Sequence, residues 1–248
     1  MAPRTYRLEI PTAYDPDEPT PLIFNFHGLG SNAVAQSVYS SLPKLAQGMG
    51  IIVVSPDALS GRWRMQAADG APAPDIVLVR ELLADINARY CVDQDRIFAA
   101  GMSLGGLMSA EVACGIPDTF AAIGMVTLEL KPARCEPVPA LVFHGTADNT
   151  VRYGALDSDA EDGTLKNLKD WATLDGCEVE PELEKLGPDV EHRVYPGCEG
   201  GAEVELYTVI GGGHTWPGSA IKIGPTTDTV DATELILEFF AKHPKSDA

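Results

Sequence analysis

The sequence predicts an α/β fold with a mostly parallel central sheet and helices on both of its faces. Short apolar runs, which are typical of buried strands, alternate along the chain with segments of helical periodicity. Parallel strands need such crossover helices, and these helices then cover both faces of the sheet. No internal repeat and no linker interrupts the alternation, so we expect residues 1–248 to form a single domain.

The residues at the ends of each segment indicate where the expected strands and helices begin and end. The expected strands are short apolar or alternating runs that end at Pro, Gly or a polar turn: 5–10, 21–26, 51–54, 96–100, 120–126, 138–144 and 203–210. The expected helices carry apolar residues at helical spacing: 75–90, 104–114, 164–174 and a last one that begins after Asp231. Asp231 and Glu234 form a capping box at the start of that last helix.

The charge balance excludes several kinds of partner. The chain has 18 basic and 36 acidic residues, a formal net charge of −18. Such a surface repels nucleic acid and anionic membranes, so we expect no nucleic-acid partner. No apolar run reaches the roughly 18 residues of a membrane-spanning helix.

Several cofactor and targeting signals are missing. No Cys-x-x-Cys, His-Glu-x-x-His or Gly-Lys-Ser/Thr spacing occurs, so we expect neither a metal site nor a phosphate-binding cofactor. Residues 1–9 lack a signal peptide's apolar segment, yet five cysteines favour an oxidising compartment. We therefore expect a secreted protein whose signal peptide is absent from this sequence.

The pentapeptide Gly101-Met-Ser-Leu-Gly105 matches the nucleophile elbow Gly-x-Ser-x-Gly. In this motif the serine lies on a sharp strand-to-helix turn, and the glycines let the strand and helix approach closely. Residues 97–100 before it are strand-like, and residues 106–110 after it are helix-like. A plain tight turn is the alternative, but this context favours Ser103 as a catalytic nucleophile.

A serine nucleophile needs a histidine base. His214 lies in Gly211-Gly-Gly-His-Thr-Trp-Pro-Gly218, a loop after the last strand, where catalytic groups tend to lie. The chain order of hydrolases with this elbow is serine, acid, histidine, which excludes His27 as the base. The remaining histidines are interpreted as a packed turn residue, a strand residue and a helix-end residue: His144, His192 and His243.

A carboxylate should orient this base from a position between the serine and the histidine. The apolar strand 138–143 leads into His144-Gly-Thr-Ala-Asp148 and so delivers Asp148 after a glycine turn. Asp157 and Asp159 lie in an acidic stretch that we expect to be solvated. We therefore predict that Ser103, His214 and Asp148 form a catalytic triad.

The oxyanion formed by such a triad needs preorganised backbone N–H donors. We expect one from Leu104, directly after the nucleophile, and one from Leu29 in His27-Gly-Leu-Gly30. An ordinary strand-end turn is the alternative for that glycine pair. Trp216, close to His214, and Trp63, in the long loop 60–73, are candidates to line the substrate cleft, although aromatic residues more often pack in a core.

These motifs together resemble the secreted polyhydroxybutyrate depolymerase and feruloyl esterase group of α/β-hydrolases. The resemblance spans essentially the whole chain through the blocks 26–32, 90–97, 101–106, 143–148 and 211–218, of which the last is the most specific. It implies the α/β-hydrolase fold and a metal-free serine esterase that acts outside the cell on plant-wall esters or polyesters.

Two departures from the group leave the substrate open. Position 104 is often Asn or Ala in the group, and the loop Thr127–Lys131 lacks the usual small residues. We expect a monomer that acts on feruloyl esters, small or polymeric, with polyesters or acetyl esters as the alternative. A peptidase of related fold is a further rival, and a non-catalytic glycan-binding protein is a rival of another class.

Five cysteines do not determine a disulfide connectivity. The resemblance implies a pair between Cys177 and Cys198. A pair between Cys114 and Cys135 is sterically conceivable, and it would leave Cys91 unpaired.

Overall fold

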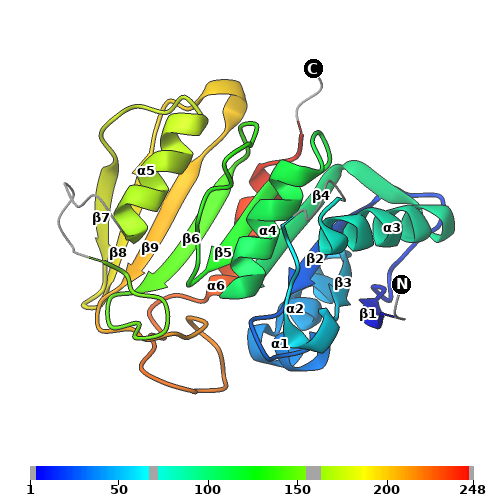
Figure 1. Ribbon diagram of the computed structural model, residues 1–248, viewed down its shortest axis with the longest axis horizontal. Helices are drawn as coiled ribbons and strands as arrows, with labels where there is room; N and C mark the ends of the chain where they lie inside the picture. The colour runs from blue at the N-terminus through cyan, green and yellow to red at the C-terminus, as the bar shows by residue number, and fades with distance from the viewer. Residues whose placement is uncertain (1–3, 67–71, 155–162, 246–248) are drawn as a thin grey trace.

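Within the residues that the computed structural model describes (4–66, 72–154 and 163–245), nine strands form one sheet in the order β1-β3-β2-β4-β5-β6-β9-β8-β7 (Figure 1). The strands are Tyr6–Glu9 (β1), Thr20–Phe26 (β2), Ile52–Pro56 (β3), Val92–Met102 (β4), Ala122–Val126 (β5), Ala140–Gly145 (β6), Glu182–Leu186 (β7), Val190–Tyr195 (β8) and Val204–Val209 (β9). The six strands from β3 to β9 in this order are parallel. β1, β8 and β7 pair antiparallel at the two edges, so the predicted mostly parallel sheet is confirmed.

Helices cover both faces of the sheet, as the prediction requires. They are Ala33–Ser40 (α1), Leu42–Gly48 (α2), Pro74–Arg89 (α3), Leu104–Gly115 (α4), Thr164–Leu174 (α5) and Ala232–Lys242 (α6). Figure 1 shows α4 in front of the strands and α6 behind them. Two separate apolar cores result: α3, α4 and α5 pack on one face around Phe24 and Trp171, and α2 and α6 pack on the other around Phe98 and Phe240. No helix in the described part of the chain is both long and apolar enough to cross a bilayer.

The elements that the sequence did not predict are the short helices α1 and α2 and the edge strand β7. Pro43 at the start of α2 interrupts the helical pattern of residues 33–48. Four of the five β7 residues are exposed and the fifth is half-buried, so this strand has no alternating apolar face and depends on pairing with β8. His192 lies in β8, as expected.

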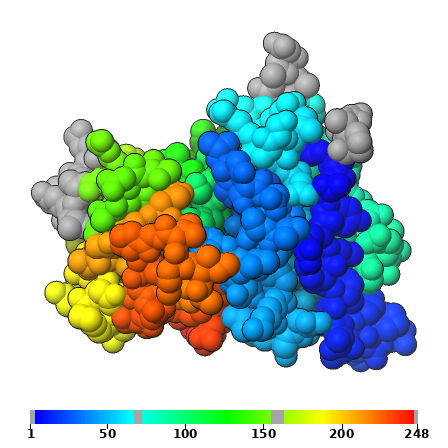
Figure 2. Space-filling model, turned by 90° about the horizontal axis from the view of Figure 1, so that it is seen from below, coloured from blue at the N-terminus to red at the C-terminus, as the bar shows by residue number. Residues whose placement is uncertain are grey.

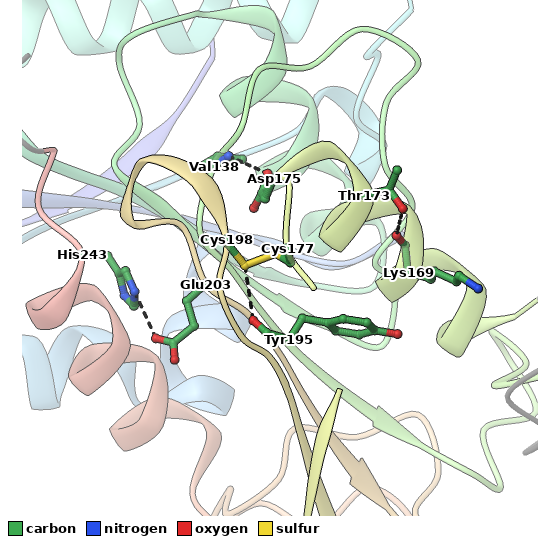
Figure 3. Close-up of a disulfide and its surroundings, with 9 residues drawn as sticks. All are labelled: Val138, Lys169, Thr173, Asp175, Cys177, Tyr195, Cys198, Glu203 and His243. Atoms are coloured by element: carbon green, nitrogen blue, oxygen red, sulfur yellow. Dashed lines mark hydrogen bonds and ion pairs between the residues drawn. A yellow bond between two sulfur atoms is a disulfide. The ribbon is translucent and has the colours of Figure 1, made fainter. Parts of the chain in front are cut away.

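Two disulfides each link cysteines that are 21 residues apart in sequence. Cys114 at the end of α4 pairs with Cys135, and Cys177 after α5 pairs with Cys198 before β9 (Figure 3). The implied Cys177–Cys198 pair is therefore confirmed, and the conceivable Cys114–Cys135 pair is present. Among the described residues Cys91 is the one cysteine outside a disulfide.

The carboxyl ends of the parallel strands share one edge of the sheet, which Figure 2 views from below. There the orange segment that follows β9 lies beside the blue segment that contains α1. Hydrogen bonds join the two segments: the Trp216 N–H donates to the Tyr39 hydroxyl (2.9 Å), and the Ser219 hydroxyl donates to the Tyr39 carbonyl (2.7 Å). Residues almost 180 apart in sequence thus meet where the chain's predicted catalytic groups lie.

Candidate active site

Ser103 occupies the turn between β4 and α4 in a conformation that side chains rarely adopt. Its φ is +56° and its ψ is −124°, a strained combination for any residue except glycine. Strain of this kind costs of order 1–3 kcal/mol and persists only where the surroundings enforce it. Here the Ser103 N–H donates to the carbonyl of Val126 on the neighbouring strand β5, at 2.7 Å.

The glycines of the motif are needed for close packing. A Cβ on Gly105 would lie 2.1 Å from the Phe26 carbonyl oxygen, and one on Gly101 would lie 2.3 Å from the Gly105 carbonyl oxygen. Neither position leaves space for a side chain, because the clashing atoms belong to the backbone. The helix and two strands can therefore pack closely enough to support the strained serine.

His214 and Asp148 are joined by a hydrogen bond. The Nδ1–H of His214 donates to Oδ2 of Asp148 at 2.7 Å, and the Asp148 side chain is fully buried. The other oxygen, Oδ1, accepts from the N–H groups of Thr150 and Val151 at 2.8 and 2.9 Å. A proton on Nδ1 leaves the Nε2 lone pair of a neutral His214 free to accept a proton.

The Asp148 carboxyl is held in its ionised form. Burial by itself raises its pKa, but hydrogen bonds from His144, His214 and the two backbone amides outweigh burial and hold the pKa at about 2. Asp148 therefore carries a full negative charge at neutral pH and can stabilise a positively charged His214.

Ser103 and His214 line the same cavity, of about 440 Å³. Most of the other side chains around it are apolar or aromatic: Leu29, Ala35, Val38, Tyr39, Met102, Ile221 and Ile223. Within the described residues no hydrogen bond joins Ser103 to His214, a contact that often tightens only when substrate binds. Asp157 and Asp159, the other acids considered, lie outside the described residues.

The two predicted oxyanion donors lie close to the nucleophile. Leu104 follows Ser103 directly, and a Cβ on Gly28, the residue before Leu29, would lie 3.9 Å from Ser103 Oγ. In the described part of the structure neither the Leu29 N–H nor the Leu104 N–H has a hydrogen-bond acceptor. Both amides therefore have the free N–H that an oxyanion would need.

A buried histidine holds the peptide that carries the Leu29 N–H. The Nδ1–H of His27 donates to the Gly28 carbonyl at 2.7 Å, while Nε2 accepts from the Ala58 N–H at 3.0 Å. Burial lowers the pKa of His27, so the ring stays neutral. Because the Gly28 carbonyl and the Leu29 N–H belong to one trans peptide, this bond directs the N–H away from the ring.

The expectation that Trp216 lines the cleft is wrong. Its side chain is fully buried, and its indole N–H donates to the Thr233 hydroxyl of α6 at 2.9 Å. Trp216 therefore anchors the loop that carries His214. Trp63 is also in the core, with its indole N–H on the His27 carbonyl at 2.8 Å, but it borders a second cavity of about 670 Å³ next to Leu104. Its role in binding stays a prediction.

The apolar lining of the Ser103 cavity was not predicted from the sequence. Val38 and Tyr39 come from α1, and Ile221 and Ile223 come from the loop after His214. Ile223 is 62% exposed and Val38 is 58% exposed, so both present apolar surface to solvent at the cavity. Ile221 and Ile223, two apolar residues close together in the long loop after His214, were the sequence feature that could have indicated this lining. Among the described residues, no three His, Cys, Asp or Glu side chains gather as a metal site would require.

Comparison with known proteins places this chain in a family. The family model described as "Esterase PHB depolymerase" matches residues 5–130. Feruloyl esterase B of Piromyces equi is 34% identical over 228 residues, which are 84% of this chain and 42% of the relative. Feruloyl esterase D of Neurospora crassa is 28% identical over 85% of this chain and 73% of the relative. This chain thus spans less than half the length of the Piromyces enzyme.

A solved structure supports the fold. Acetyl xylan esterase from Aspergillus awamori superposes with a TM-score of 0.70 over 96% of this chain and 93% of that one, at 16% identity. At that identity the likeness concerns the fold alone. The likeness extends over nearly the whole length of both chains. The chain belongs to the esterase PHB depolymerase family and, by that membership, is a carboxylic ester hydrolase of the α/β-hydrolase fold.

Proposed function

We propose that this chain hydrolyses carboxylic esters through a Ser103–His214–Asp148 triad and an acyl-enzyme intermediate. The observation that carries the proposal is the strained elbow serine, which shares one cavity with a histidine bonded to a buried, ionised aspartate. A non-catalytic glycan-binding protein would have no need for strain at this serine or for unpaired amides beside it.

Each step of the proposed reaction uses a group described above. Ser103 Oγ attacks the ester carbonyl carbon while His214 Nε2 takes its proton, and Asp148 stabilises the imidazolium. The tetrahedral oxyanion accepts hydrogen bonds from the N–H groups of Leu29 and Leu104. His214 then protonates the departing alcohol. A water molecule, deprotonated by the same histidine, attacks the acyl-enzyme and releases the acid.

The lining of the Ser103 cavity favours an acyl group with an apolar body. Val38, Tyr39 and Ile223 offer apolar and aromatic surface, and about 440 Å³ exceeds what an acetyl group alone would fill. We therefore propose plant-wall feruloyl esters as the substrate, as the names of the Piromyces and Neurospora relatives suggest. Polyesters are the alternative, because the same apolar surface suits an aliphatic acyl chain.

The two disulfides support a further part of the proposal, activity outside the cell. Disulfides persist in oxidising compartments and are rare in the cytosol. We also propose that residues 1–248 act as one catalytic domain and as a monomer.

The mechanism is tested by labelling and kinetics. We expect a fluorophosphonate probe to label wild-type protein and Ser37→Ala, whose serine lies on α1 outside the cavity lining, but not Ser103→Ala. Ser103→Ala should also lose roughly 10⁴-fold or more in kcat. Retention of labelling and ester hydrolysis in Ser103→Ala would refute the mechanism.

The substrate is tested by comparing kcat/KM for methyl ferulate with that for p-nitrophenyl acetate and butyrate. Ferulate turnover comparable to that of the activated esters supports the feruloyl proposal. Turnover of only the short activated esters refutes it and favours aliphatic polyesters or acetyl esters.

A further inference from the structure

A second histidine lies behind the proposed catalytic acid. His144, at the end of β6, is 1% exposed, and its Nε2 is 3.5 Å from Oδ2 of Asp148, the oxygen that accepts from His214. On its other side, Nδ1 is 2.8 Å from Oε2 of Glu129, which is also 1% exposed. Glu129, His144, Asp148 and His214 thus form a continuous row of ionisable side chains.

The neighbours of the His144 ring favour its protonated form. Nε2 lies 3.0 Å from the carbonyl oxygen of Val151, which can only accept a hydrogen bond, so Nε2 carries a proton. Nδ1 faces the Glu129 carboxylate, which when ionised also only accepts. The Thr164 hydroxyl, 2.9 Å from Nδ1, can accept as well. Both nitrogens therefore face groups that can accept a hydrogen bond, an arrangement that fits an imidazolium.

The surrounding charges agree with this assignment. Burial alone lowers the pKa of His144, but the carboxylates of Asp148 and Glu129 outweigh burial and raise it to about 10. For Glu129, burial raises the pKa, and the bonds from His144 and Asn167 outweigh that effect and lower it. Among the described residues, Tyr153 also faces the ring, edge-on, with the ring centroids 5.5 Å apart.

Tyr153 is the link from this row to β8 and β9. Its hydroxyl is 2.8 Å from that of Thr208 on β9, and Arg193 of β8 donates to the same Thr208 hydroxyl at 3.4 Å. Arg193 thus reaches Tyr153 through the Thr208 hydroxyl, and no hydrogen bond or ion pair joins it to His144 within the described residues. His144 Nε2, by contrast, lies 3.5 Å from Asp148 Oδ2.

We propose that His144 and Glu129 are a positioning pair for Asp148. The pair fixes the Asp148 carboxylate and offsets part of the negative charge that Asp148 presents to His214. The proposal rests on the proposed triad and extends it by two residues. Within the pair, the positive His144 lies nearer to His214 than the negative Glu129 does. Because like charges repel, the pair makes protonation of His214 less favourable. Glu129 keeps the imidazolium charged at its buried position, which an unpaired cation could not occupy without a large penalty.

The kinetic test removes both charges and keeps the hydrogen-bonding groups, in the double variant His144→Gln/Glu129→Gln. The matched control is His192→Gln/Glu205→Gln, which removes a His–Glu pair of similar length (2.6 Å) between β8 and β9. We expect the test variant to lose roughly tenfold in kcat with KM changed less than twofold. We also expect the acid limb of its kcat/KM profile to move up by about half a pH unit.

The control variant should reproduce the wild-type profile. A folded test variant whose kcat and pH profile also match wild type would overturn the proposal. A merely structural role predicts lower yield or stability but no displacement of the acid limb.

A second measurement uses the wild-type protein and does not depend on the variant folding. In protein labelled with ¹⁵N-histidine, we expect both ring nitrogens of His144, assigned through its backbone, to remain protonated from pH 5 to pH 9. A neutral His144 ring at pH 7 would overturn the proposal. Because this readout needs no activity, it is separable from the Ser103→Ala test of the triad itself.

Discussion

Asp175 is predicted to make this protein less stable as the pH rises. It caps the C-terminus of α5, close to the Cys177–Cys198 disulfide (Figure 3), and is 0% exposed. One carboxyl oxygen accepts from the Val138 N–H at 3.1 Å, and within the described residues the other has no hydrogen-bond partner. Burial, opposed only by that one bond, raises the pKa of Asp175 to about 7.

The sign and size of the effect follow from linkage. The pKa in the folded state is about 7, whereas in the unfolded chain it is about 3.9. Below pH 4 both states are protonated and there is no penalty. As the pH rises from 4 to 7, the carboxyl ionises in the unfolded chain but stays protonated in the folded protein, so stability is lost. Above pH 7 both states are ionised and the loss levels off. With these two values, the penalty grows by about 2–3 kcal/mol between pH 5 and pH 8.

The assay is urea unfolding of wild type and Asp175→Asn at pH 5 and pH 8, with disulfides intact. The buried amide has its own cost, but this cost is equal at both pH values and cancels. The variant should therefore gain about 2–3 kcal/mol relative to wild type on going from pH 5 to pH 8. Asp95→Asn, which removes an exposed carboxylate, is the control and should show little pH dependence. An equal stability difference at both pH values for Asp175→Asn would refute the reasoning.

Two further predictions concern the disulfide and the oxyanion loop. Cys177→Ala/Cys198→Ala opens a loop of 21 residues and should lower the free energy of unfolding by about 3 kcal/mol, measured by urea titration; an unchanged midpoint would contradict this. His27→Gln should lower kcat by roughly tenfold with little change in KM, because the Gly28–Leu29 peptide loses its fixed orientation. Steady-state kinetics checks this, and an equal change in KM and kcat would indicate altered substrate binding instead.

The fold was largely predictable because local patterns and the global arrangement agree. The predicted helix 164–174 coincides with α5, and the predicted strand at 21–26 differs from β2 by one residue. The predicted strands 120–126 and 138–144 lie within two residues of β5 and β6, since continuous apolar runs ending at polar turns are characteristic of buried parallel strands. The alternating run 203–210 lies within one residue of β9. The edge strand β7 was not predictable in this way, because its residues are exposed and only pairing with β8 organises them.

The candidate site was also predictable only in part. Ser103, Asp148 and His214 could be chosen from the sequence because each follows a strand within a distinctive motif. Trp216 belongs to the same motif as His214, but no pattern indicated that its side chain turns into the core to bond Thr233. Sequence proximity to a catalytic residue does not determine side-chain direction, which depends on what packs against the loop.

The sequence by itself therefore determined the order of elements, the elbow and the identity of the three triad candidates, since these depend on residues near one another in the chain. Only the tertiary structure decided which distant groups surround them. Glu129 meets His144 because β5 and β6 are adjacent parallel strands with Val126 opposite Phe143. Tyr39 meets the His214 loop across almost 180 residues. Such contacts depend on strand order and register, which are properties of the folded sheet as a whole.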